Sequence, residues 1–135
     1  MARKRGPLKT SIISGGAGGL GRALSAQLIT NGWHVIALDI DASTLESGPQ
    51  LTPIQVDLTD ADALTAALTH VLASRPSVDL VIYNAGVSHI SAFADAPEHA
   101  QRHVFEITYF SAIALGRLTL PALRASHGTH LAISS

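Results

Sequence analysis

A cluster of glycines separates an apolar run from an amphipathic segment near the start of the chain, in the stretch Thr-Ser-Ile-Ile-Ser-Gly-Gly-Ala-Gly-Gly-Leu-Gly-Arg-Ala-Leu that begins at Thr10. The apolar run predicts a buried strand over Thr10–Ser14. Apolar residues at i, i+4 and i+8 predict a helix over Leu20–Thr30. Glycines between the two allow a tight turn and a close approach of phosphates to the backbone. A strand, a glycine turn and a helix in this order favour a dinucleotide pyrophosphate at the helix N-terminus.

The glycine spacing fits more than one phosphate-binding template. The P-loop spacing is present, but Arg22 and Ala23 stand where that loop needs Lys and Ser/Thr, which disfavours a nucleotidase. Gly15, Gly19 and Gly21 fit G-x-x-x-G-x-G, and Gly15, Gly18 and Gly21 fit G-x-x-G-x-x-G. The glycines alone leave the choice among the templates open, together with a tight turn that binds nothing.

Strand and helix patterns alternate along the rest of the chain. Further strands are predicted over Trp33–Leu38, Pro53–Val56, Val78–Tyr83 and His130–Ser134, and helices over Asp60–Ser74 and Ala96–Arg124, with a short helix or loop over Asp39–Gln50. Pro121 should kink or divide the long helix. Apolar strands separated by helices indicate a parallel sheet covered on both faces. Right-handed crossovers then give an α/β fold, a Rossmann-like doubly wound sheet of order 3-2-1-4-5, incomplete at its C-terminal side.

Composition excludes several classes of protein. The 135 residues suffice for one domain, predicted over residues 10–135, and 47% apolar with 14% charged residues excludes a disordered chain. A net charge of -1 predicts no nucleic-acid partner, and no apolar run is long enough to span a membrane. Without cysteine there is no disulfide or Cys-type zinc site, and the sequence predicts a cytoplasmic protein.

The basic residues 1–9 are predicted to be a solvated leader. His99 and His103 are four residues apart but lack a third ligand, so no metal site is predicted.

Asp39 ends the second predicted strand, 24 residues beyond Gly15. An acid at this place suits hydrogen bonds from the adenosine ribose hydroxyls of a dinucleotide. Its charge would repel a 2′-phosphate, so NAD is favoured over NADP. The alternative is an ordinary helix-capping aspartate, a role for which Asp41 is the better placed residue.

Three motifs together resemble the short-chain dehydrogenase/reductase family, in its ordinary rather than extended branch. They are Ser14-Gly15-x-x-x-Gly19-x-Gly21, Asp57-Leu58 after the third strand and Asn84-Ala85-Gly86 after the fourth, and the resemblance covers essentially the whole chain. It implies an NAD(P)-dependent oxidoreductase that transfers hydride between a nicotinamide cofactor and a small alcohol or carbonyl substrate. It also implies a homo-oligomer for a full-length form. The implied cofactor-binding residues are Ser14, Gly15, Gly19, Leu20, Gly21, Asp39, Asp57, Leu58, Asn84, Ala85 and Gly86.

Catalysis in this family uses a Ser that orients the substrate oxygen, followed by Tyr-x-x-x-Lys, in which Tyr is the general acid/base. Ser135 aligns with the Ser, and no Tyr or Lys follows it. Thr108 stands where the family usually has an Asn, whose paired donor and acceptor a threonine cannot copy. The resemblance therefore implies an N-terminal portion of such an enzyme, truncated before the Tyr-x-x-x-Lys helix and inactive alone. The alternatives are a non-catalytic dinucleotide-binding module and a decayed gene product.

Overall fold

A five-stranded parallel sheet forms the centre of the molecule, in a computed structural model that describes residues 6–134. The strands are β1 (Thr10–Ser14), β2 (His34–Asp39), β3 (Leu51–Gln55), β4 (Leu80–Tyr83) and β5 (Thr129–Ala132). They lie in the order β3-β2-β1-β4-β5, and every neighbouring pair is parallel. The doubly wound sheet and its predicted strand order are confirmed.

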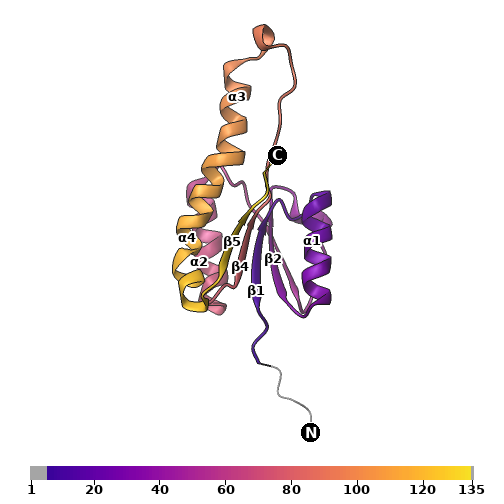
Figure 1. Ribbon diagram of the computed structural model, residues 1–135, viewed down its shortest axis with the longest axis vertical. Coiled ribbons are helices and arrows are strands. Elements are labelled where there is room, and N and C mark those ends of the chain that lie inside the picture. Colours follow the sequence, from indigo (N-terminus) through magenta and orange to yellow (C-terminus); the bar gives the residue numbers. More distant parts are fainter. Residues whose placement is uncertain (1–5, 135) are drawn as a thin grey trace.

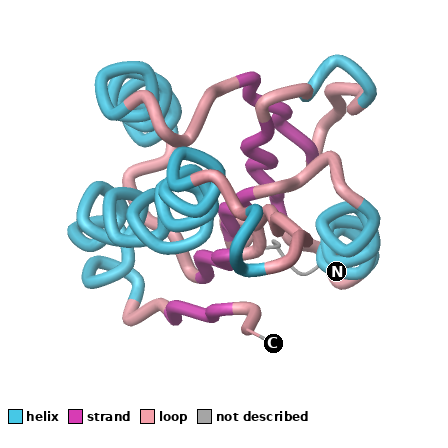
Figure 2. The backbone as a smooth tube through the Cα atoms, turned by 90° about the horizontal axis from the view of Figure 1, so that it is seen from above, coloured by secondary structure: helices cyan, strands magenta, loops and turns pink. Residues whose placement is uncertain are grey.

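Helices cover both faces of this sheet. The α-helices are α1 (Gly19–Thr30), α2 (Ala61–Ser74), α3 (Glu98–Phe105) and α4 (Ser111–Ser126); short 3-10 turns η1 (Ala42–Thr44) and η2 (Phe93–Asp95) and a π-helical turn η3 (Glu106–Phe110) complete the elements. Figure 1 shows α1 on one face of the sheet and α2 with α4 on the other. Helix α3 rises beyond the carboxyl ends of the strands, and the view from above in Figure 2 shows the helices set around the sheet.

Neighbouring residues of the central strand enter two separate cores, because successive side chains of a strand point to opposite faces. Ile12 is fully buried among residues of α2 and α4, including Leu68 and Leu115. Ile13, also fully buried, packs on the other face with Ile82, where Leu24 of α1 covers it. Burial on both faces explains why the strands read as continuous apolar runs in the sequence.

Local signals set the ends of the helices. The Asp60 carboxylate accepts a hydrogen bond from the Ala63 N–H at 2.9 Å and caps the start of α2. Helix α1 ends at Thr30, and its C-cap residue Asn31 is followed by Gly32, whose φ of +80° belongs to the left-handed region that glycine adopts readily. The end of α1 agrees with the sequence prediction, and α2 begins one residue after its predicted start.

Two predicted features of the chain differ in the structure. The long helix is not divided at Pro121, which lies inside α4; the irregular turn is η3, further toward the N-terminus. Pro121 and Arg117 are both exposed, so the Arg117 carbonyl that loses its helical donor lies on the solvent side. Strand β3 begins at Leu51 and contains Pro53, which an edge strand tolerates because one side of its backbone has no strand partner.

Candidate functional site

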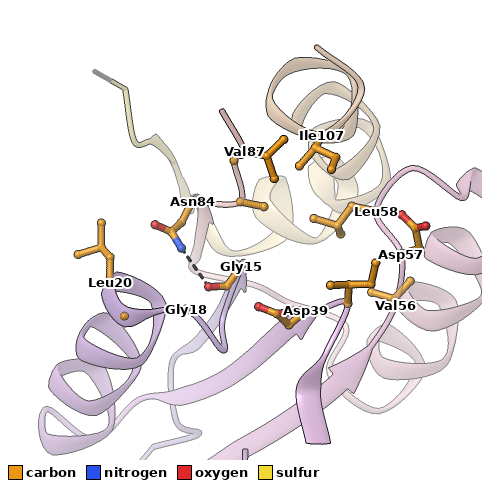
Figure 3. Close-up of a pocket in the computed structure, with 14 residues that line it drawn as sticks. Gly15, Gly18, Leu20, Asp39, Val56, Asp57, Leu58, Asn84, Val87 and Ile107 are labelled. Atoms are coloured by element: carbon orange, nitrogen blue, oxygen red, sulfur yellow. Dashed lines mark hydrogen bonds between the residues drawn. The ribbon is translucent and has the colours of Figure 1, made fainter. Parts of the chain in front are cut away.

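A cleft of about 430 Å³ lies at the carboxyl ends of β1, β2 and β4. Its lining comes from the glycine turn after β1, the ends of β2 and β4, the segment after β3 and the π-helical turn η3. Figure 3 shows Asp39, Asp57, Asn84 and Ile107 from these separate parts of the chain around one opening. Open parallel sheets bind ligands at this edge, where the strand order reverses.

The glycine turn has a shape that side chains would prevent. Gly15 has φ of +68°, and a Cβ there would lie 3.0 Å from the Ala85 Cα. A Cβ on Gly21 would lie only 2.2 Å from the Gly15 carbonyl oxygen. The first turn of α1 can therefore pack directly on the turn that precedes it, which brings the start of the helix to the cleft.

The start of α1 carries backbone N–H groups that no side chain in the described part of the chain caps. Gly18 is the N-cap residue, has no side chain to accept a hydrogen bond, and is followed by no acidic residue in the first turn. Both Gly18 and Gly19 line the cleft, and a Cβ on Gly19 would meet no atom within 4 Å. Free N–H groups and the positive end of the helix dipole, facing open space, suit an anion.

The Ser14 hydroxyl joins β1 to the segment after β4. It accepts hydrogen bonds from the backbone N–H groups of Asn84 and Ala85, both at 3.1 Å. In return, the Asn84 side-chain amide donates to the carbonyls of Ser14 (3.2 Å) and Gly15 (3.1 Å), the second of which is drawn in Figure 3. These bonds fix Asn84-Ala85-Gly86 beside the glycine turn, although Ser14 itself is buried beneath the cleft.

Asp39 presents its carboxylate at the end of β2. The Ala17 N–H donates to Oδ2 at 2.9 Å, and the Asp41 N–H donates to Oδ1 at 3.0 Å. Two backbone donors therefore hold the group at the rim of the cleft. Asp41 takes the capping role instead: its carboxylate accepts from the Ser43 N–H at 3.2 Å and from the Ser43 hydroxyl at the start of η1, which lowers the pKa of Asp41.

Asp57 and Leu58 close the far end of the cleft, after β3. The Thr59 hydroxyl donates to the Asp57 carboxylate at 2.7 Å and the Thr59 N–H at 2.9 Å, and these bonds lower the pKa of the Asp57 carboxyl, with a smaller effect of the same sign from His103. Asp57 is therefore ionised at neutral pH and can accept a hydrogen bond from a ligand.

A comparison with protein families identifies the chain. The family model described as short chain dehydrogenase matches residues 9–135. The chain belongs to this family. Membership classes it among the oxidoreductases and agrees with the resemblance carried by its three motifs.

Individual members of the short chain dehydrogenase family are similar to this chain over about half of their own length. Dehydrogenase/reductase SDR family member 7B of Bos taurus is 33% identical, with 92% of this chain and 43% of the relative covered. The 1-deoxy-11-beta-hydroxypentalenate dehydrogenase of Streptomyces exfoliatus is 28% identical, with 94% and 51% covered. The crystal structure of a short-chain dehydrogenase from Streptomyces avermitilis has a TM-score of 0.89 and 28% identity, with 95% and 49% covered. The chain spans about half the length of these relatives.

Nine of the residues predicted to bind a cofactor line the cleft, namely Gly15, Gly19, Leu20, Asp39, Asp57, Leu58, Asn84, Ala85 and Gly86. Ser14 and Gly21 do not line the cleft. Ser14 binds the Asn84 backbone beside it, and Gly21 allows α1 to pack on the glycine turn. Gly18, Ile40, Val56, Val87 and Ile107 also line the cleft and were not predicted. Gly18 belongs to the G-x-x-G-x-x-G template that the glycine spacing left open. Ile107 lies in η3, far from the other lining residues in the sequence, and no sequence pattern pointed to it as a cleft residue.

Two further positions were named from the catalytic pattern of the family, Ser135 and Thr108. Ser135 is outside the described residues. Thr108 is in η3, and its hydroxyl would be 3.7 Å from a Cβ built on Gly86, so it lies near the end of the Asn-Ala-Gly segment. Over residues 6–134 no three acidic or histidine side chains gather as metal ligands, and none of the helices is long and apolar enough to cross a membrane.

Proposed function

We propose that the cleft binds a nicotinamide dinucleotide. The observation that carries this proposal is the uncapped, acid-free start of α1, which faces the same cleft as Asp39 and Asn84-Ala85-Gly86. A free phosphate would need only the helix start. The Asp39 carboxylate and the apolar walls of the cleft extend the site on both sides of the helix start. This shape suits a ligand with a pyrophosphate centre and two nucleoside ends.

The residues along the cleft divide among the parts of such a ligand. The N–H groups after Gly18 would hold the pyrophosphate, and Asp39 would accept hydrogen bonds from the adenosine ribose. Asp57 would accept one from the adenine amino group, and the Asn84–Gly86 backbone would lie beside the nicotinamide half. The bound nicotinamide supplies hydride chemistry. Family membership supports hydride exchange with a small alcohol or carbonyl as the activity of a complete enzyme of which residues 10–135 form the dinucleotide-binding part.

We further propose a preference for NAD over NADP. The Asp39 carboxylate is held in place by Ala17 and Asp41, so it cannot turn away from a ligand without losing two hydrogen bonds. NADP carries a 2′-phosphate on the adenosine ribose that Asp39 would contact. Its binding would therefore bring the negative phosphate next to the negative carboxylate. At about 4 Å such a contact costs roughly 1–4 kcal/mol, depending on the local dielectric.

Ser135 is proposed to donate a hydrogen bond to the substrate oxygen, as the family motif implies. A lone serine hydroxyl needs an activating partner to move a proton near neutral pH. The Tyr-x-x-x-Lys motif of the family has no counterpart among these 135 residues, because neither Tyr83 nor Tyr109 has a lysine four residues on. A full-length form is proposed to be a homo-oligomer; Phe105, Tyr109 and Phe110 are exposed apolar side chains on α3 and η3 that a second copy would cover.

Calorimetric titration of the chain with NAD and with NADP tests the proposal. NAD should bind more tightly, and Asp39→Ala should narrow the difference between the two dissociation constants. Asp95→Ala, an exposed carboxylate of η2 that does not line the cleft, is the matched control and should change neither constant. Tighter binding of NADP by the unmutated chain would reject the assigned preference, and binding of neither would reject the site.

A further inference from the structure

The guanidinium of Arg22 joins the glycine turn to the segment that follows β2. Arg22 lies in the first turn of α1 and its side chain is exposed. Its Nε–H donates to the Ala17 carbonyl at 2.7 Å. Its Nη2 donates to the Thr44 hydroxyl at 2.5 Å and to the Thr44 carbonyl at 3.3 Å. One planar group with several fixed donors thus connects two segments that are 27 residues apart, a contact that a lysine could not reproduce.

Ala17 links this contact to the acid at the end of β2. Its carbonyl accepts from Arg22, and its N–H donates to the Asp39 carboxylate at 2.9 Å. The two peptide groups that flank Ala17 are therefore oriented from opposite sides. On the other side of the contact, Thr44 ends η1, whose N-cap residue Asp41 donates its own N–H to the second oxygen of Asp39. Both backbone donors to Asp39 belong to segments that Arg22 holds together.

We propose that Arg22 is a positioning residue for Asp39 in dinucleotide binding. This inference rests on the proposed function, since it concerns the carboxylate assigned to the adenosine ribose. Arg22 fixes the Ala17 peptides and the η1 segment, and so keeps the Asp39 carboxylate at one place on the rim of the cleft. Without Arg22 the two donors of Asp39 move independently, and the ribose loses a preformed acceptor.

The geometry separates this role from direct contact with the ligand. Neither Arg22 nor Thr44 lines the cleft, whereas Asp39 does. Among the described residues 6–134, the guanidinium donates hydrogen bonds to Ala17 and Thr44 and makes none to Asp39. Arg22 therefore acts through other residues. The rival role, a cation that binds a 2′-phosphate, predicts a loss confined to NADP, and the test distinguishes the two.

A double-mutant cycle on the chain tests the coupling between Arg22 and Asp39. Arg22→Met should weaken NAD binding about five-fold, the effect of one lost charge-assisted contact at an exposed position. Arg22→Lys should not restore it. In the Asp39→Ala background, Arg22→Met should cause no further loss, because the residue through which it acts is gone. Arg102→Met removes another exposed arginine, paired with Glu98 on α3, and should leave the NAD dissociation constant unchanged.

Hydrogen exchange of the Ala17 amide gives a second readout that needs no cofactor. Exchange at Ala17 should be faster in Arg22→Met than in the unmutated chain, and unchanged in Arg102→Met, because only the first variant frees the peptide that Asp39 binds. An unchanged exchange rate, an equal loss of NAD affinity with and without Asp39, or a loss confined to NADP would each overturn the role of Arg22. If the unmutated chain binds neither dinucleotide, the proposed function fails, and the contact itself is judged on Ala17 exchange alone.

Discussion

The histidine at the start of β2 makes the stability of this fold depend on pH. His34 is 3% exposed, and its Nδ1 lies 3.1 Å from the Arg75 Nη2. Because a guanidinium only donates hydrogen bonds, Nδ1 is the acceptor and the ring proton is on Nε2, which donates to the Thr52 hydroxyl at 2.9 Å. Burial lowers the pKa of His34 and the Arg75 charge lowers it further, against a smaller opposite effect from the backbone of Pro49.

The sign of the pH dependence follows from this lowered pKa. An unfolded chain releases the imidazole to its ordinary pKa of 6.5, so below that pH the unfolded state binds more protons than the folded state. The contribution of neutral His34 is fully present above pH 6.5 and is lost as the pH falls from 6.5 through the lowered folded pKa. One group changes the free energy of unfolding by at most about 1.4 kcal/mol per pH unit. That is a large fraction of a total of about 5–15 kcal/mol.

Urea unfolding between pH 8 and pH 5 measures this effect. The unmutated chain should lose stability below pH 6.5, and His34→Gln should remove most of the slope at some cost in stability at pH 8. His70→Gln, an exposed histidine of α2, is the control and should keep the slope. The lowered carboxyl pKa values of Asp41 and Asp57 act below pH 3.8, outside this window. A slope that survives His34→Gln would refute the assignment to this buried imidazole.

Three further predictions concern the cleft and the chemistry. Gly19→Val should abolish NAD binding in calorimetry yet change the free energy of unfolding by less than about 1 kcal/mol, because its Cβ meets no protein atom; retained affinity would place the phosphate elsewhere. Ser14→Ala should lower the free energy of unfolding, measured with urea, by about 1–3 kcal/mol, because two backbone N–H groups lose their acceptor. Ser25→Ala is the control and should lower it by less, because the buried Ser25 hydroxyl has no partner within the described chain. The 135-residue chain with NAD and secondary alcohols should form no measurable NADH, because the absence of a general acid/base lowers the reaction rate about 10²–10⁴-fold. A steady rate of NADH formation that Ser135→Ala abolishes would contradict this.

Local chemistry made much of the fold predictable. The bounds of β1 were predicted correctly, as were the ends of α1 at Thr30 and of α2 at Ser74, because each depends on residues within a few positions in the sequence. Pro121 misled the prediction because the penalty for proline depends on whether solvent can reach the carbonyl one turn earlier. That exposure is a property of tertiary packing, which no local pattern contains.

The cleft was predictable where its residues follow strands. Asp39 ends β2, and Asp57 and Asn84 follow β3 and β4 within two residues, so the topology of one parallel sheet brings them to a single edge. Ile107 reaches the cleft only because the chain returns over it through α3 and η3, and the contact of Arg22 with Thr44 depends on how a loop folds back. Contacts made by loops and by helices that cross the sheet edge carried no periodic signal in the sequence.

The position of β1 in the middle of the sheet also determines how the chain must fold. Its two neighbours in the sheet are β2 and β4. The Thr10 N–H at its start donates a hydrogen bond to the carboxylate of Asp79, which directly precedes β4 and is 69 residues away in the sequence. Closing so long a loop is slow, because the entropy is lost before the contacts form. During synthesis β1 leaves the ribosome before the other four strands of this sheet and has no partner on the β4 side until β4 emerges. A fully buried strand is therefore the one exposed longest, and we expect fast pairing with β2 to limit association of the nascent chain with other chains.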